Sequence, residues 1–108
     1  MAQVKVVWTL LALEDLNSAY EYLQEERPSS IRLMGQRIEK ALQALSRHPF
    51  IGRSGRVLNT KELVIPGTPF ILPYRLKKER IEILAFMHGA RRWPDEFLSD
   101  KTMEWNKL

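Results

Sequence analysis

The sequence predicts an α+β domain of the order β-α-α-β-β-β, with two antiparallel helices packed on one face of an antiparallel sheet. Two apolar stripes with the helical spacing of three and four residues lie between residues 12 and 45. Apolar and polar residues alternate with the period of a strand between residues 61 and 88. A short β-branched run at residues 3–8 (QVKVVW) predicts an opening strand. Because the helices and the sheet each have one apolar side, we expect them to bury these sides against each other.

The two predicted helices begin and end at recognisable residues. Thr9 is a suitable N-cap for the first helix, residues 27–30 (RPSS) interrupt the helical pattern, and the second helix stops before Pro49. The apolar stripes are Ala12, Leu16, Ala19, Tyr20 and Leu23, and then Met34, Ile38, Ala41, Leu42 and Leu45. The residues that we expect to be buried are Leu16, Tyr20, Ile38, Leu42, Leu72, Ile83 and Ala85.

Three consecutive strands are predicted at Lys61–Ile65, Phe70–Leu76 and Arg80–His88. Pro66-Gly67 between the first two is typical of a type II turn, because glycine accepts a positive φ. Pro73 cannot donate a hydrogen bond to a neighbouring strand, which indicates a bulge or an unpaired donor position within a continuing strand. The residues expected on the buried face are Phe70, Leu72, Tyr74, Leu76, Ile81, Ile83, Ala85 and Met87. The same alternation places Arg75 and His88 together on the opposite face.

The chain has 108 residues, which suits one domain at residues 1–98 followed by a tail at 99–108. Residues 48–59 lose all periodicity and are predicted to form a loop. Cysteine is absent, so there is neither a disulfide framework nor a thiolate metal site, and the two distant histidines predict no metal site either. No cofactor motif is present. The apolar run at residues 6–13 is too short to span a membrane and lacks a signal-peptide pattern, so we expect a soluble, cytoplasmic protein.

Positive charge is concentrated in the second half of the chain. Residues 47–92 contain ten Lys and Arg but only three Glu, a net charge of +7, whereas the whole chain carries +4. Such a surface favours a polyanionic or acidic partner, such as a nucleic acid, a ribosome or an acidic protein segment.

Several short motifs, in their order and spacing, resemble the RelE/ParE superfamily of bacterial toxins, which includes plasmid stabilisation proteins. The motifs are the opening strand into Trp8, Ala12 and Asp15-Leu16, then residues 49–53 (PFIGR), 61–63 (KEL), 73–75 (PYR) and 81–91 (IEILAFMHGAR). The resemblance covers residues 3–93 and implies the β-α-α-β-β-β fold. It also implies growth inhibition by the toxin of a type II toxin–antitoxin module, neutralised by a cognate antitoxin.

The superfamily divides by target, and the division decides whether the protein is an enzyme. RelE-type members cut mRNA on the ribosome, which requires a base, an acid and cations around the scissile phosphate. ParE-type members poison DNA gyrase instead. Here the middle strand is apolar ahead of Tyr74 and no tyrosine follows Arg75, so the nuclease pattern is incomplete and the resemblance favours a ParE-like gyrase inhibitor.

The alternative RelE-like nuclease remains open at this point, with Arg75, His88 and Arg91 as its catalytic candidates. Lys61 and Glu62 are lesser candidates, since Glu62 is more often a solvated strand residue or a partner for Arg75. The residues expected to bind the target or the antitoxin are Lys61, Arg75, Arg91, Arg92 and Trp93. A third possibility is a non-toxic module that binds nucleic acid or protein, although the chain has no zinc-finger or RNP-like motif.

Overall fold

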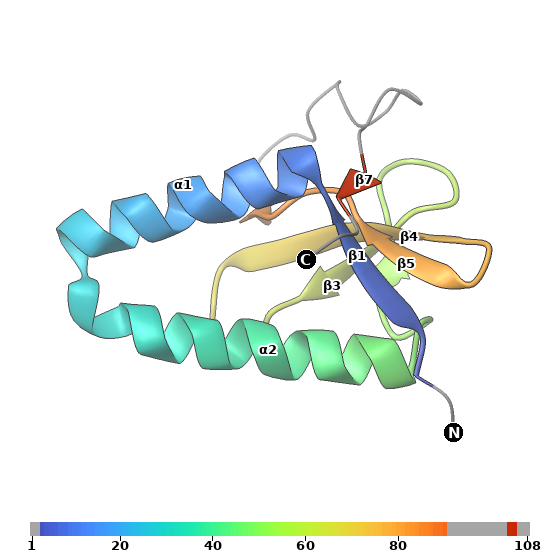
Figure 1. Cartoon of the computed structure of the whole chain (residues 1–108), viewed down its shortest axis with the longest axis horizontal. Coiled ribbons are helices and arrows are strands. Elements are labelled where there is room, and N and C mark those ends of the chain that lie inside the picture. Colours follow the sequence, from blue (N-terminus) through green and yellow to red (C-terminus); the bar gives the residue numbers. More distant parts are fainter. Residues whose placement is uncertain (1–2, 91–103, 106–108) are drawn as a thin grey trace.

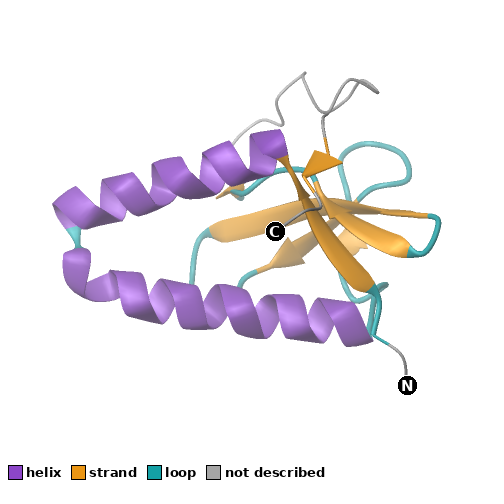
Figure 2. Ribbon diagram, viewed as in Figure 1, coloured by secondary structure: helices purple, strands orange, loops and turns teal. Residues whose placement is uncertain are grey.

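The computed structural model describes residues 3–90 and 104–105 of the chain. Strand β1 (Lys5–Thr9) leads into helix α1 (Leu10–Glu26), a 3₁₀ turn (Pro28–Ser30) and helix α2 (Ile31–Arg47). The remaining strands are β2 (Arg53–Ser54), β3 (Lys61–Val64), β4 (Phe70–Lys77), β5 (Arg80–Ile83), β6 (Met87–His88) and β7 (Glu104–Trp105). The two helices run antiparallel on one side of the sheet and spread apart from the 3₁₀ turn that joins them (Figure 1, Figure 2).

The predicted α+β fold with two helices on one face of the sheet is confirmed, with two differences in the sheet. The strand order is β2-β3-β4-β5-β1-β7, with β6 paired to β4. Strand β1 runs parallel to β5, whereas the other paired strands are antiparallel. The sheet is therefore mixed rather than wholly antiparallel. The two helices carry the chain from β1 to β2 at the edge of the sheet, and the antiparallel succession β3-β4-β5 then brings β5 beside β1 in the same direction. The predicted loop at residues 48–59 also contains the short edge strand β2.

The helical hairpin is capped and packed as its sequence predicts. The Thr9 hydroxyl accepts a hydrogen bond from the Ala12 N–H at 3.2 Å and donates one to the Ile83 carbonyl at 3.0 Å, so this N-cap also joins α1 to β5. The core between helices and sheet buries Trp8, Ala12, Ile38, Ala41, Leu45, Leu63, Ile65, Leu72, Tyr74, Ile81, Ile83 and Phe86. Of the predicted core residues, Ile38, Leu72, Ile83 and Ala85 are buried, and Leu16, Tyr20 and Leu42 are half-buried against this core.

The predicted strand Arg80–His88 is wrong in its second half, because a bulge divides it into β5 and β6. Tyr74 pairs with Ile83 and Ile71 pairs with Met87, so three residues of the later segment oppose only two of β4. The bulge lies opposite Pro73, which continues β4 and whose carbonyl accepts a hydrogen bond from the Leu84 N–H at 2.8 Å.

The extra residue reverses which side chains face the helices. Phe86 joins the helix-side core and stacks on Phe70 with a centroid distance of 4.7 Å. Ala85 and Met87 were expected beside Ile83 but instead pack in a second cluster with Ile71 and Leu84 on the other face. We call that second face, which lies opposite the helix-side core and against which Leu11 of the first turn of α1 and Val57 pack, the open face.

Part of the predicted tail contributes to the sheet. Strand β7 pairs antiparallel with β1, with Trp105 opposite Trp8 and Glu104 opposite Thr9. The predicted division between a domain at residues 1–98 and a tail at 99–108 stays a prediction, because residues 91–103 lie outside the described part of the chain.

Candidate functional site

The open face carries two buried glutamates, and each is paired with two arginines. Glu62 on β3 is 3% exposed, and its carboxylate lies 2.9 Å from Arg53 Nη2 and 3.0 Å from Arg56 Nε. A buried carboxylate requires such compensation, because loss of hydration is costly for a charged group. The prediction that Glu62 is solvated or paired with Arg75 is therefore wrong. Arg56 also donates a hydrogen bond to the Gly89 carbonyl, which joins the β2–β3 loop to the end of β6.

The second pair of arginines surrounds Glu82 on β5, which is fully buried. Arg75 Nε lies 2.6 Å from one carboxylate oxygen, and Arg80 Nη2 lies 2.8 Å from the other. Arg75 and Glu82 are directly opposite each other on β4 and β5, and Arg80 precedes Glu82 by two residues on the same face. The four arginines of the two clusters are thus oriented by carboxylates of the protein itself.

The structure does not bring the predicted nuclease residues into one cleft. Arg75 lies on the open face with Glu82, whereas His88 lies on the helix side, opposite Phe70 in the β4–β6 register. The bulge before β6 is the reason, because it reverses the alternation that placed both residues on one face. The His88 imidazole is exposed, accepts a hydrogen bond at Nδ1 from the Ala90 N–H at 3.1 Å, and lies edge-on to Phe70.

Lys61 lies on the helix side of β3, apart from Arg75. Its Nζ is 5.9 Å from the centre of the Phe50 ring and 3.5 Å from the Gly52 carbonyl oxygen. The other predicted site residues, Arg91, Arg92 and Trp93, lie outside the described residues.

Tyr74 holds the segment that precedes β2 and was expected only as a core residue. Its hydroxyl donates to the Pro49 carbonyl at 2.8 Å and accepts from the Gly52 N–H at 3.0 Å. Burial raises the pKa of the Tyr74 phenol above its ordinary value, and the hydrogen bond from Gly52 opposes this shift. Between these two anchors, Phe50 and Ile51 project outward and are 73% and 45% exposed. The alternation in the sequence predicts that the Tyr74 ring is buried. It gives no sign that the Tyr74 hydroxyl closes a loop.

Tyr74→Phe is expected to lower the free energy of unfolding by about 1–3 kcal/mol, because it leaves the part-buried Pro49 carbonyl and the buried Gly52 N–H without their partner. Urea unfolding of both proteins measures the loss. Because the raised pKa favours the neutral phenol in the folded state, the contribution of Tyr74 is complete below pH 10.0, the ordinary tyrosine value, and declines as the pH rises through the folded-state pKa. The variant should therefore approach the wild type in stability at alkaline pH. A difference that grows above pH 10 would contradict this role.

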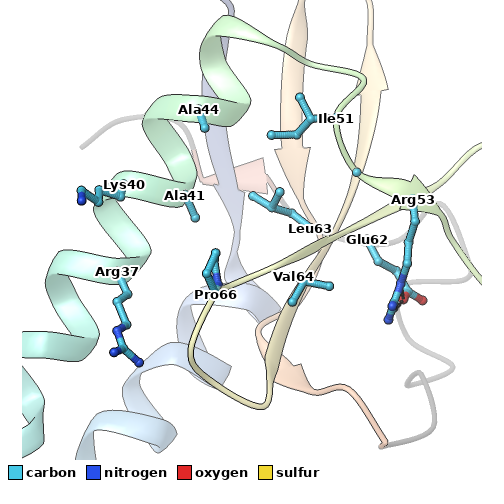
Figure 3. A pocket seen from close by; sticks show the side chains of 11 residues that line it. Arg37, Lys40, Ala41, Ala44, Ile51, Arg53, Glu62, Leu63, Val64 and Pro66 are labelled. Atoms are coloured by element: carbon cyan, nitrogen blue, oxygen red, sulfur yellow. Dashed lines mark hydrogen bonds and ion pairs between the residues drawn. The ribbon is translucent and has the colours of Figure 1, made fainter.

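A groove separates α2 from the edge of the sheet at β3 (Figure 3). We call it the α2–β3 groove; its volume is about 450 Å³. Its apolar lining consists of Ala41 and Ala44 of α2, Ile51, Leu63, Val64 and Pro66. Three cations, Arg37, Lys40 and Arg53, stand at its rim, and the lining includes one carboxylate, Glu62.

A second, wider hollow of about 910 Å³ lies between the two helices, the β3–β4 turn and β6. Its lining includes Tyr22 and Leu23 of α1, Leu33 and Met34 of α2, Phe70 and Phe86 of the sheet side, and His88. Arg37 donates a hydrogen bond to the Gly67 carbonyl at 2.6 Å, which ties α2 to the β3–β4 turn. His88 thus belongs to a mainly apolar hollow rather than to the arginines of the open face.

Residues 3–90 and 104–105 contain no group of three His, Cys, Asp or Glu side chains that is arranged to hold a metal ion. Neither α1 nor α2 is long and apolar enough to cross a membrane.

Known proteins resemble this chain over nearly the whole described region. The sequence model of the family described as "ParE toxin of type II toxin-antitoxin system, parDE" matches residues 6–93. "Putative toxin Y4kP" of Sinorhizobium fredii is 37% identical over 94 residues, which cover 87% of this chain and 97% of that protein. "Toxin RelE2" of Caulobacter vibrioides is 31% identical over 91 residues, covering 84% and 99% of the two chains. The solved "Chromosomal ParDE TA system from P. aeruginosa" matches with a TM-score of 0.69 at 26% identity, over 80% of this chain and 96% of that one.

Proposed function

From the premise that the chain belongs to the ParE toxin family of type II toxin–antitoxin systems, we propose that its target is DNA gyrase and that it acts in the cytoplasm. The observation that carries the proposal is the separation of Arg75 and His88 onto opposite faces of the sheet. A cognate antitoxin is the partner that this family implies.

The separation weighs against an mRNA nuclease for a chemical reason. Cleavage of RNA requires one group to remove the 2′-hydroxyl proton, another to protonate the leaving oxygen, and cations to stabilise the phosphorane between them. These groups must lie within hydrogen-bond reach of the same phosphate. His88 on the helix side cannot serve a phosphate bound at Arg75, and Arg75 is already oriented by Glu82 at 2.6 Å.

The basic residues of the second half then serve in binding rather than in catalysis. We assign Lys61, beside the α2–β3 groove, to antitoxin contact. The residues that we assign to gyrase are Arg91, Arg92 and Trp93, which come after Gly89 and Ala90 in the chain. Arg75 serves mainly to compensate the buried charge of Glu82 in this proposal.

His88→Ala is expected to leave both growth inhibition and inhibition of gyrase supercoiling within about threefold of the wild type. If His88 were a general acid or base, its loss would reduce ribosome-dependent mRNA cleavage by about 10²–10⁴-fold. The matched comparison is a variant in which Arg91 and Arg92 are both alanine, which should lose gyrase inhibition while keeping its thermal stability. Purified wild-type protein that cleaves mRNA on ribosomes and leaves gyrase unaffected would overturn the proposal.

A further inference from the structure

We infer that the open face binds the phosphate backbone of duplex DNA at the corner of the sheet where β1 and β5 begin and β4 ends. We call this cluster of cations the basic corner; it consists of Lys5, Lys77, Lys78 and Arg80. The inference rests on the proposed function in one respect, namely that the DNA is the duplex on which gyrase acts. The β4–β5 turn and the start of β1 lie at the end of the sheet away from the 3₁₀ turn that joins the helices (Figure 1).

Strand pairing places three of these cations in one row. Lys77 is directly opposite Arg80 on β4 and β5, and Arg80 is in turn beside Lys5 of β1. All three side chains lie on the open face, because Arg80 contacts Glu82 there and paired residues share a face. Neighbouring strands are about 4.8 Å apart, so the row extends about 10 Å across the sheet. Like charges directly opposite each other destabilise a sheet, so the fold alone gives no reason for this row.

The carboxylate nearest to the row is already used by the protein. Glu82 is fully buried and shares its two oxygens between Arg75 and Arg80. Lys5 and Lys77 are exposed, and within residues 3–90 neither forms an ion pair with a carboxylate. The row therefore keeps a net positive charge that an external anion can neutralise.

The two-residue turn between β4 and β5 adds a further lysine at a costly backbone position. Lys78 has a φ of 58°, in the left-handed region where glycine or asparagine is usual in a hairpin turn. A hollow of about 350 Å³ is lined by Lys77, Lys78, Glu79 and Arg80, so three cations surround it with one acid. The lysine in the turn and the row of like charges beside it both oppose stability, which is typical of a binding site.

The composition of the basic corner favours duplex DNA over an acidic protein segment or single-stranded RNA. Protein interfaces are centred on apolar and aromatic anchors, and single-stranded RNA stacks its bases on aromatic side chains. Within residues 3–90, the large apolar side chains that are exposed lie outside the basic corner; they are Leu10, Tyr22, Leu33, Phe50, Ile51, Leu58 and Val64. The phosphates of a duplex are bound chiefly by lysine and arginine, in contacts that carry no sequence information.

The salt dependence of DNA binding tests the basic corner directly. With a fluorescent duplex of about 20 base pairs, the logarithm of the wild-type affinity should fall against that of the salt concentration with a slope of about −3, from about three phosphate contacts. Lys5→Gln combined with Lys77→Gln should weaken binding about tenfold at low salt and reduce the slope to about −1. Arg32→Gln combined with Lys40→Gln makes the same change in net charge on exposed positions of α2. This control should keep the wild-type slope and an affinity within about threefold.

Lys77→Glu separates a loss of binding from a loss of structure. It replaces the like-charge pair with Arg80 by an opposite-charge pair, so the Tm should equal or exceed that of the wild type. The affinity for the duplex should nevertheless fall about tenfold or more, because an attraction to phosphate becomes a repulsion. A Tm clearly below that of the wild type would show that Lys77 supports the fold and would overturn its assignment to DNA.

Inhibition of gyrase supercoiling connects the basic corner to the proposed function. Half-inhibition by the Lys5→Gln and Lys77→Gln double variant should require about tenfold more protein than the wild type. Unchanged DNA affinity and unchanged inhibition would overturn the inference and leave the proposed function intact. A wild-type chain that binds the duplex with the expected slope but does not inhibit gyrase would overturn the proposed function and leave the phosphate site intact. Tighter binding of single-stranded RNA than of the duplex, or a double variant that loses only antitoxin binding, would overturn the choice of DNA.

Discussion

Glu82→Ala is expected to lower the free energy of unfolding by about 3 kcal/mol, the lower end of the range for breaking a buried ion pair. Glu82 is fully buried, and the substitution removes the carboxylate that Arg75 and Arg80 share. Both arginines keep some exposure, 22% and 30%, so they regain part of their hydration, which limits the loss. Urea unfolding followed by circular dichroism measures the change.

The matched control for this prediction is Glu79→Ala, which removes the same charge from the exposed turn between β4 and β5. Its effect should stay within about 0.5 kcal/mol, as is usual for surface positions. Equal losses in the two variants would show that net charge, rather than the buried pairing of Glu82, determines the stability.

Leu45→Ala is expected to cost about 2–5 kcal/mol, because Leu45 is fully buried on α2 against the sheet and its truncation leaves a cavity. Leu42, one turn earlier, is only half-buried, so Leu42→Ala should cost less. Thermal and urea unfolding of the two variants provide the comparison. A larger loss for Leu42→Ala would place the centre of the helix–sheet core elsewhere.

The helical hairpin could be predicted closely because its signals are local. Thr9 caps α1 through a contact with Ala12 three residues away, and Pro28 and Pro49 mark the ends of the two helices. The Pro66-Gly67 turn is equally local: Gly67 has a φ of 77°, and the Thr68 N–H bonds to the Ile65 carbonyl.

The bulge between β5 and β6 was harder to place, although Pro73 signalled it. Pro73 indicates that the hydrogen bonding of β4 with its neighbours is irregular, but not which strand carries the extra residue. The extra residue lies in the segment that faces β4, within Leu84–Phe86. A shift of one position reverses every following side chain, so the predicted faces of Ala85, Met87 and His88 were all wrong. The error at His88 matters most for function, because the observed face separates His88 from Arg75 and so weighs against the nuclease alternative.

The buried glutamates could not be predicted, because their burial depends on contacts between separate strands. Both glutamates lie in a basic segment, and Glu62, directly after Lys61, was expected to be solvated or paired with Arg75. Strand pairing brings Arg75 to Glu82, beside Arg80 of the same strand, and the segment of β2 and the loop after it brings Arg53 and Arg56 to Glu62. The α2–β3 groove escaped prediction for the same reason, since its walls lie on α2 and β3.

The parallel pairing of β1 with β5 has a consequence for the order in which the toxin folds during synthesis. The Thr9 hydroxyl and the Ile83 carbonyl, which meet at 3.0 Å, are 74 residues apart in the chain. Contacts between such distant residues form late, whereas the helical hairpin depends on local contacts and can form early. A nascent chain that ends before β5 has no partner strand for β1, which leaves Trp8 without the sheet it packs in. Incomplete translation products should therefore be unfolded and open to proteolysis, and the chain should become harmful only when almost all of it has left the ribosome.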